Sequence, residues 1–339
     1  MKTINVNISK LFAASMIIVN VFASCSKDSS APVQAPSVNA KQNSASVKNA
    51  EVISINALAG TKAIEAVTGN TASLAAAAYY LPNGHRYPEH MDKAEVYMPE
   101  QGVHYQSAAN YSSKNDYFFP EDGSLTIFSY APYETLKDVV KIDPTVANGV
   151  TIPSEYDIEK NQDVYFMVAS AVANKSANDS QNGLKANYSL AISEIGGLTI
   201  SLGEDHETEV YNLKSVSISG HYTKGTYANG WTLSGEQSEG YVLYNESDEN
   251  VITSEGLNAI NTGNGKYLVL PQSFKEGQVM LNIVYTITTG ETVQTISENV
   301  DMSNFITGFS ANRKYDFNIT LSQSGQITWN PSVSNWENC

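Results

Sequence analysis

Two stretches in the second half of the chain carry an apolar residue at every second position. From Val279 to Ile287 these residues alternate with positions that include Asn282 and Thr286, and the segment from Tyr315 to Leu321 repeats the pattern. Successive side chains of a β-strand point to opposite faces of the sheet. Both stretches are therefore predicted to be strands with one face in a core and the other in water.

Shorter apolar stretches in the same half are separated by turn-forming residues. Leu198 to Leu202, Ser215 to Ser219 and Lys266 to Leu270 are each bounded by Gly, Asn or Pro, which favour turns. Short strands with such punctuation are typical of a β-sandwich. Residues 184–339 are therefore predicted to form a C-terminal β-sandwich domain.

The first half of the chain predicts strands that are buried on both faces. Asp163 to Ala171 is apolar at both parities, as in a central strand. The periodicity of Ser73 to Leu81 fits a helix or a strand, and the turn that follows it favours a strand. Tyr117 to Tyr133 places two apolar stretches around a Pro-Glu-Asp-Gly turn at 120–123, which predicts a hairpin.

The expected domain organisation follows from these stretches. Residues 51–183 are predicted to form an N-terminal β-sandwich domain, and the polar, glycine-terminated segment 174–183 is predicted to connect it to the next domain. Residues 25–50 hold Ser, Ala, Asn, Gln and Lys with almost no large apolar side chain. Such a segment cannot bury enough surface to offset its ordering entropy, so we expect a disordered tether.

Residues 1–24 have the pattern of an export signal. Lys2 and Lys10 precede an apolar run of thirteen residues, Leu11 to Ala23, which is too short to span a membrane as a helix. Small residues before Cys25 resemble the lipobox of bacterial lipoproteins, in which the cysteine thiol carries a lipid. The alternative is an ordinary signal peptide with an incidental cysteine. Diacylation at Cys25 would anchor the mature protein stably on a membrane.

Composition narrows the class of protein. Only 16% of the 339 residues are charged and 20 are tyrosine, a bias that suits extracellular β-proteins. The formal charge of −15 repels phosphate backbones, so nucleic acid is not expected as a partner. The two cysteines, Cys25 and Cys339, cannot form a disulfide framework or a cysteine-rich zinc site.

No constellation of residues predicts catalysis, a metal or a cofactor. His85 and His90 flank a loop that contains Pro88, and their spacing fixes no shared face, so they are interpreted as loop histidines and not as metal ligands. The segment from Glu204 to Glu209 lacks the offsets and the glycine of a calcium loop. No nucleophile elbow, phosphate-binding loop or dinucleotide fingerprint is present in the sequence, and an enzyme is not expected.

Three aromatic residues are candidates for glycan binding. Tyr222, Tyr227 and Trp231 lie among Gly and Asn, where exposed rings could stack on a sugar. The alternative is that they cap the edge of the sandwich.

Several motifs follow one another along the chain in a characteristic order. An aromatic-Pro-acidic turn leads into a strand and an Ala-Pro-Tyr end between Tyr117 and Tyr133, and Tyr267 to Gln272 precedes the alternating strand from Val279. After a lipoprotein signal and a polar tether, this order resembles the fimbrillin family, the type V pilus proteins of Gram-negative gut and mouth anaerobes. Further motifs carry the resemblance: Gly60-Thr61-Lys62-Ala63, Ala77-Ala78-Tyr79-Tyr80, Asn312 to Thr320, Trp329 and Trp336.

The resemblance implies an all-β protein of two tandem β-sandwich domains with transthyretin-like topology. It implies an exported lipoprotein of the cell outer membrane that is surface-exposed and built into adhesive fimbriae, with other pilus subunits as partners and an unknown receptor. In the family, removal of a first strand opens a groove that a C-terminal strand of the next subunit fills. By position, residues 326–336 would be the donor strand, through Ile327, Trp329, Val333 and Trp336, and residues 52–58 the released strand, through Val52, Ile53 and Ile55.

One departure from the family concerns processing. Family members are cut at arginine, but Arg86 and Arg313 are the only arginines here and neither could release an N-terminal strand. A cut would have to use Lys48 or Lys62, or not occur. An uncut chain favours a tip, anchor or accessory component. The predicted function is a non-enzymatic subunit of cell-surface fimbriae; the alternative is a surface lipoprotein that binds glycans and does not polymerise.

Overall fold

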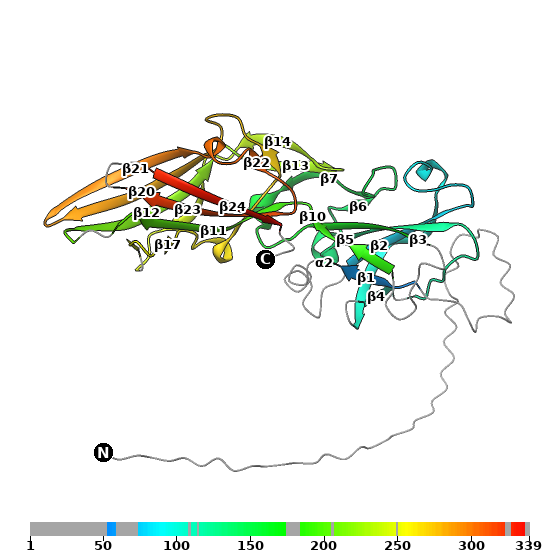
Figure 1. Ribbon diagram of the computed structural model, residues 1–339. Helices are drawn as coiled ribbons and strands as arrows, with labels where there is room; N and C mark the ends of the chain where they lie inside the picture. Colours follow the sequence, from blue (N-terminus) through cyan, green and yellow to red (C-terminus); the bar gives the residue numbers. More distant parts are fainter. Residues whose placement is uncertain are drawn as a thin grey trace, which may run out of the picture. The chain divides into compact units, whose positions relative to one another are not determined.

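The computed structural model describes residues 53–58, 74–107, 110–113, 115–173, 184–204, 207–248, 250–322 and 327–335 (Figure 1). These residues belong to one compact unit. Strands dominate it, and the only α-helix among the described residues is the four-residue α2 (Tyr133–Leu136). No helix in the described part of the chain is long and apolar enough to cross a membrane. The prediction of an all-β fold is confirmed.

The largest sheet has eight strands and forms one layer of the first sandwich. Its order is β10-β8-β5-β2-β3-β4-β1-β9, and the two strands at its ends, β9 and β10, are separated by one residue in the sequence. The strands are β1 (Ile55–Leu58), β2 (Leu74–Leu81), β3 (Glu95–Ser107), β4 (Asn110–Ser113), β5 (Ser124–Ala131), β8 (Met167–Ala173), β9 (Leu184–Asn187) and β10 (Ser189–Leu190).

The strand predicted at 163–171 to be central and buried on both faces is only partly present: β8 begins at Met167, lies second from one end of the sheet beside β10, and has three residues that are not buried. β5 lies between β2 and β8, and all its residues except the first are buried. The predicted strand at 73–81 is confirmed as β2, which is buried along its whole length. The predicted hairpin at 117–133 is wrong. Residues 115–123 contain a single bridged residue, Phe118, because the edges of β5 are already occupied by β2 and β8.

The second layer of the first sandwich has the order β14-β13-β7-β6. Its strands are β6 (Lys141–Ile142), β7 (Val150–Asp157), β13 (Tyr222–Ala228) and β14 (Trp231–Gln237). The expected domain boundary at 183/184 does not separate the two sandwiches. Four strands that follow residue 183 in the sequence, β9, β10, β13 and β14, belong to the first sandwich. The first core includes Ile152, Tyr156, Phe166 and Tyr227, with Trp231 packed against it.

The second sandwich contains the two strands with clear alternation. One layer has the order β17-β11-β23-β24 with β18 on β11, and the other has the order β15-β12-β20-β21 with β16 on β12. The alternation is confirmed, because Leu281, Ile283, Phe317 and Ile319 all lie in the second core. The strands are β11 (Ser193–Leu202), β12 (Glu209–Ser219), β15 (Tyr241–Asn245), β16 (Val251–Ile252), β17 (Leu257–Asn258), β18 (Tyr267–Val269), β20 (Met280–Thr289), β21 (Thr292–Asp301), β23 (Arg313–Leu321) and β24 (Ile327–Asn335).

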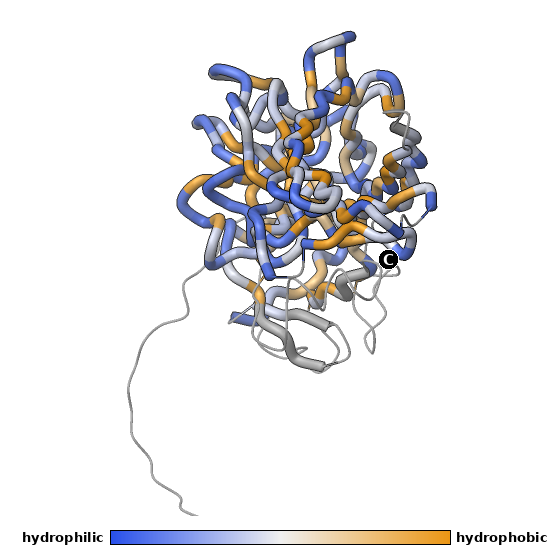
Figure 2. Tube along the Cα trace, turned by 90° about the vertical axis from the view of Figure 1, so that its left-hand side faces the viewer, coloured by the Kyte–Doolittle hydropathy of each residue, from blue (hydrophilic) through white to orange (hydrophobic). Residues whose placement is uncertain are grey.

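Hydropathy follows this arrangement along the chain. Apolar and polar positions follow one another along the strands, and hydrophilic positions are prominent in the outer loops (Figure 2). A separate two-stranded ribbon pairs β19 (Gln272–Ser273) with β22 (Gly308–Phe309). Short 3₁₀ turns complete the described elements: η3 (Met91–Lys93), η4 (Ile158–Asn161), η6 (Gly263–Gly265) and η7 (Met302–Asn304).

A buried histidine lies where the chain crosses from the second sandwich to the first. His221, between β12 and β13, is 0% exposed. Its Nε2 lies 2.6 Å from the Tyr267 hydroxyl, which in turn donates to Glu159 at 3.4 Å. Glu159 belongs to η4 beside the first sandwich, so this hydrogen-bond chain links the two halves of the fold. Burial lowers the pKa of His221 from 6.5 to about 4.

The buried histidine predicts a loss of stability in acid. In the unfolded chain His221 binds a proton near pH 6.5, whereas in the folded protein it stays neutral down to about pH 4. Its contribution is therefore complete above pH 6.5 and is lost as the pH falls through this window, at a total cost of about 3 kcal/mol. Urea unfolding of the protein and of His221→Gln at pH 7.5 and 4.5 measures this. We expect the free energy of unfolding to fall less between pH 7.5 and pH 4.5 in the variant than in the unchanged protein. An equal fall in both would contradict the prediction.

Candidate functional site

The last described strand, β24, lies on the edge of its sheet. It pairs antiparallel with β23 from Arg313↔Asn335 to Leu321↔Ile327, and no other described strand pairs with it (Figure 1). In the described part of the chain β24 is therefore an edge strand, the position in a sheet at which a further strand can add. Pro331 lies in the middle of the strand, where the missing N–H is tolerated because the strand is at an edge.

A single described side chain anchors β24 in the second core. Trp329 is 8% exposed, stacks on Phe305 with ring centroids 4.6 Å apart, and meets the edge of Phe317 at 5.7 Å. Its indole Nε1 is buried and has no hydrogen-bond partner among the described residues. An unpaired buried N–H costs about 1–3 kcal/mol, which weakens the docking of β24 on its own sandwich.

Beyond Trp329, the apolar row of β24 reaches solvent. Val333 shares the parity of Trp329, yet it is 49% exposed. Thr328, Asn330 and Ser332, on the opposite parity, are exposed as well. β24 is thus held mainly by its backbone bonds to β23 and by one ring. The strand predicted at 326–336 is present from Ile327 to Asn335; the side chain of Ile327 and all of Trp336 lie outside the described residues.

The first described strand, β1, lies inside its sheet and not at an edge. It runs antiparallel to β4 and parallel to β9, so both of its edges are paired. The Ile53 N–H donates to the Tyr117 carbonyl at 2.7 Å, and the Ser54 carbonyl accepts from Leu184 N–H at 2.8 Å. Both Ile53 and Ile55 are buried in the first core. Val52, the third residue predicted for this strand, lies outside the described residues.

Loss of β1 would open a continuous groove. β1 is the only described strand that pairs with β9, so its departure would leave facing edges on β4 and β9 and an empty place in the core where the two isoleucines lay. Lys48 and Lys62 lie outside the described residues, on either side of β1 in the sequence. A cut at Lys62 would separate β1 from the rest of the chain, whereas a cut at Lys48 would leave it attached.

The three aromatic residues predicted to contact glycans do not present free rings. Tyr227 is 6% exposed, and the expectation of an exposed ring is wrong for it. Trp231 packs against Tyr227 and Phe166 in the first sandwich, and its Nε1 donates to the Ala191 carbonyl at 2.7 Å. Burial raises the pKa of Tyr227 to about 12. Tyr222 is half-buried and is held through its backbone by Gln272. Tyr227 and Trp231 are paired across β13 and β14 and face the core, whereas Tyr222 lies on the opposite parity of β13.

The described residues show no metal-binding arrangement. They contain no group of three or more His, Cys, Asp or Glu that could hold a metal ion. His85 and His90 lie edge to face with ring centroids 5.1 Å apart, beside an exposed Arg86–Glu89 ion pair of 2.8 Å. Cys25 and Cys339 lie outside the described residues, as do Asp205 and His206 of the acidic loop.

Comparisons with known proteins agree with this architecture. A family model described as fimbrillin-like matches residues 84–336. A fimbrial protein from Bacteroides vulgatus ATCC 8482 has a TM-score of 0.62 at 13% identity, covering 84% of this chain and 99% of that chain, which shows a shared fold. A protein from Bacteroides uniformis ATCC 8492, described as a candidate cell adhesion protein, has a TM-score of 0.48 at 20% identity and coverages of 84% and 98%. A search of curated proteins gives no match.

Proposed function

Because this chain belongs to the fimbrillin-like family, we propose that it is a structural and adhesive subunit of cell-surface fimbriae and has no catalytic role. Copies join when β24 of one subunit takes the place of β1 in another. The observation that carries this proposal is the exposed Val333, an apolar residue in line with Trp329 that the strand's own sandwich does not bury.

The features of β24 support a role as the donated strand. It sits at an edge, so it can leave without breaking pairs on two sides. Its residues Ile327, Trp329 and Val333 share one parity, with Pro331 between the last two, so they lie on one face of the strand and could fill pockets along a groove between two strands. The indole N–H of Trp329, which has no hydrogen-bond partner among the described residues, lowers the cost of leaving.

The features of β1 support a role as the released strand. Its two edges and its buried isoleucines define a site with backbone partners on both sides and pockets for alternate apolar side chains. An incoming strand in this site gains two rows of backbone hydrogen bonds, whereas β24 on its own sheet has one. This difference favours exchange once β1 has left.

Export and anchoring belong to the same proposal. The apolar segment before Cys25 directs export, and lipidation of that cysteine holds the subunit on the outer membrane. The absence of an arginine near β1 favours a tip, anchor or accessory subunit over a stalk subunit. The lipid and the cell surface are its partners besides other subunits.

Gel electrophoresis of cell extracts tests the proposal. Strand-exchanged polymers resist detergent, so an unboiled extract is expected to give a high-molecular-weight ladder that collapses to one band on boiling. A lipoprotein that binds glycans without polymerising would give a monomer band in both lanes, and that result would overturn the proposal.

A further inference from the structure

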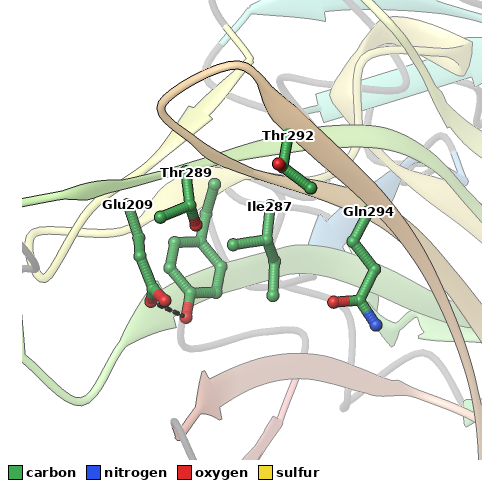
Figure 3. A pocket seen from close by; sticks show the side chains of 6 residues that line it. Glu209, Ile287, Thr289, Thr292 and Gln294 are labelled. Carbon is green, nitrogen blue, oxygen red and sulfur yellow. Dashed lines mark hydrogen bonds between the residues drawn. The ribbon is translucent and has the colours of Figure 1, made fainter.

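A hollow at the end of the second sandwich is lined by side chains from three neighbouring strands. Its volume is about 350 Å³, near the lower end of the roughly 300–1,000 Å³ typical of small-molecule sites. Figure 3 shows Glu209, Ile287 and Gln294 projecting toward the same side of their strands. The complete lining is Glu209, Tyr211, Ile287, Thr289, Thr292 and Gln294.

The register of the sheet sets these six side chains in two rows. Glu209 pairs with Thr289, which pairs with Thr292 across a two-residue turn. One step along the strands, Tyr211 pairs with Ile287, which pairs with Gln294. Directly paired residues share a face, so both rows lie on the same face of the sheet. With neighbouring strands about 4.8 Å apart and alternate residues about 7 Å apart, the platform measures about 10 by 7 Å.

Two side chains of the platform, Glu209 and Tyr211, are positioned by contacts with each other and with a neighbouring ring. The Tyr211 hydroxyl donates to Glu209 Oε2 at 3.0 Å, and the Tyr211 ring stacks on Tyr285 with centroids 6.1 Å apart. This fixes the Glu209 carboxylate at the edge of the hollow. Gly290, with φ of 58°, makes the tight turn that brings Thr289 and Thr292 side by side.

The chemistry of the lining fits a ligand rich in hydroxyl groups and disfavours an anionic one. The Glu209 carboxylate accepts hydrogen bonds, whereas the threonine hydroxyls and the Gln294 amide both donate and accept. Sugar hydroxyls also do both, and Ile287 offers an apolar patch for a sugar's C–H face. The lining contains no Lys or Arg, and the chain carries a net charge of −15, so acidic ligands are disfavoured.

We propose that this hollow, the Glu209–Gln294 platform, binds a neutral sugar unit of a glycan. The site is independent of strand donation, because neither β1 nor β24 contributes to its lining. It gives the adhesive subunit a contact with a glycan-bearing surface, at a place other than the buried rings of Tyr227 and Trp231.

Ligand-observed NMR of the purified full chain tests the proposal. The probes are the methyl glycosides of galactose, glucose, mannose and N-acetylglucosamine at millimolar concentration, with glucuronate as the acidic comparison. We expect saturation transfer to at least one neutral probe and weaker transfer to glucuronate. No transfer to any neutral probe, or glucuronate binding as strong as the best neutral probe, would overturn the proposal.

Three variants locate the binding. Glu209→Gln retains an oxygen for the Tyr211 hydroxyl but removes the charge, and Gln294→Ala removes the amide; each is expected to weaken binding by about tenfold. Thr295→Ala is the matched control, because Thr295 is exposed on the other face of the same strand and should leave binding unchanged. Unfolding temperature verifies that all three fold. Binding that is equal in all three variants would place the ligand elsewhere and contradict the proposal.

Discussion

Cutting the chain after Lys62 is expected to convert the protein from a monomer into a ladder of multimers. While β1 is covalently attached, its effective concentration at its own site is high and an incoming strand cannot compete. A cut after Lys62 makes β1 a separate peptide, whose described contacts are its backbone bonds and the buried side chains of Ile53 and Ile55. Once the peptide dissociates, β24 of another copy can fill the groove between β4 and β9.

The measurement uses a recognition sequence for a site-specific protease, inserted after Lys62. After digestion, unboiled samples are expected to change from one band to a ladder. The same sequence inserted after Lys48 is the matched control, because that cut precedes β1 and leaves it attached. A ladder of equal strength from both insertions, or from neither, would show that β1 does not control assembly.

Val333→Asp is expected to abolish this ladder while leaving the monomer folded. Val333 is 49% exposed on its own sandwich, so the substitution should change the free energy of unfolding by no more than about 0.5 kcal/mol. In the groove left by β1, the same parity faces the first core, where an unpaired carboxylate costs several kcal/mol. Since each 1.4 kcal/mol is about tenfold in affinity, assembly should fall by at least about a hundredfold.

Ser332→Asp separates this effect from charge alone. Ser332 is exposed and lies on the opposite parity of β24, which would face solvent in the groove, so this variant should still assemble. The ladders of the two variants are compared by gel densitometry after the same protease digestion. The stabilities of the two monomers are compared by urea unfolding. Assembly that survives in Val333→Asp, or is lost equally in both variants, would contradict the proposed orientation of the strand.

The sequence predicts the strands of this protein best where alternation is clear. β20 and β23 each have one face in a core and one face in water, so apolar residues occupy every second position along most of each strand. The hairpin expected at 117–133 fails for the opposite reason. Its turn residues and apolar stretches are local signals, whereas the partners of β5 are β2 and β8, which lie far away in the chain. Local turn chemistry cannot reveal which distant edges are available.

The exchange of strands between the two halves of the sequence could not be predicted. β13 and β14 leave the second sandwich through Gly220 and His221 and complete the first. Their composition resembles that of any surface hairpin, with Tyr222, Tyr227 and Trp231 among small polar residues. If these residues lie in loops, their rings are expected to be exposed; if they lie on strands that cover a core, the rings are expected to be buried. Only the pairing of β13 with β7 decides between these readings.

The positions of the two strands β1 and β24 were predicted, but their pairing was not. Spacing and resemblance locate both strands near residues 52–58 and 326–336, and the structure has β1 and β24 within those ranges. The contrast between them depends on pairing, which a sequence does not contain: β1 is paired on both sides and β24 on one. The Glu209–Gln294 platform gave no sequence signal, because its two rows combine residues about eighty positions apart through sheet register.

A cryo-electron microscopy reconstruction of the assembled filament tests the central claim most directly. The question is which residues lie between β4 and β9 of each subunit. We predict density for β24 of the neighbouring copy, identified by the indole of Trp329, with Val333 facing the first core. Density for the subunit's own Ile53 to Leu58 in that place, with β24 still paired to its own β23, would contradict the account.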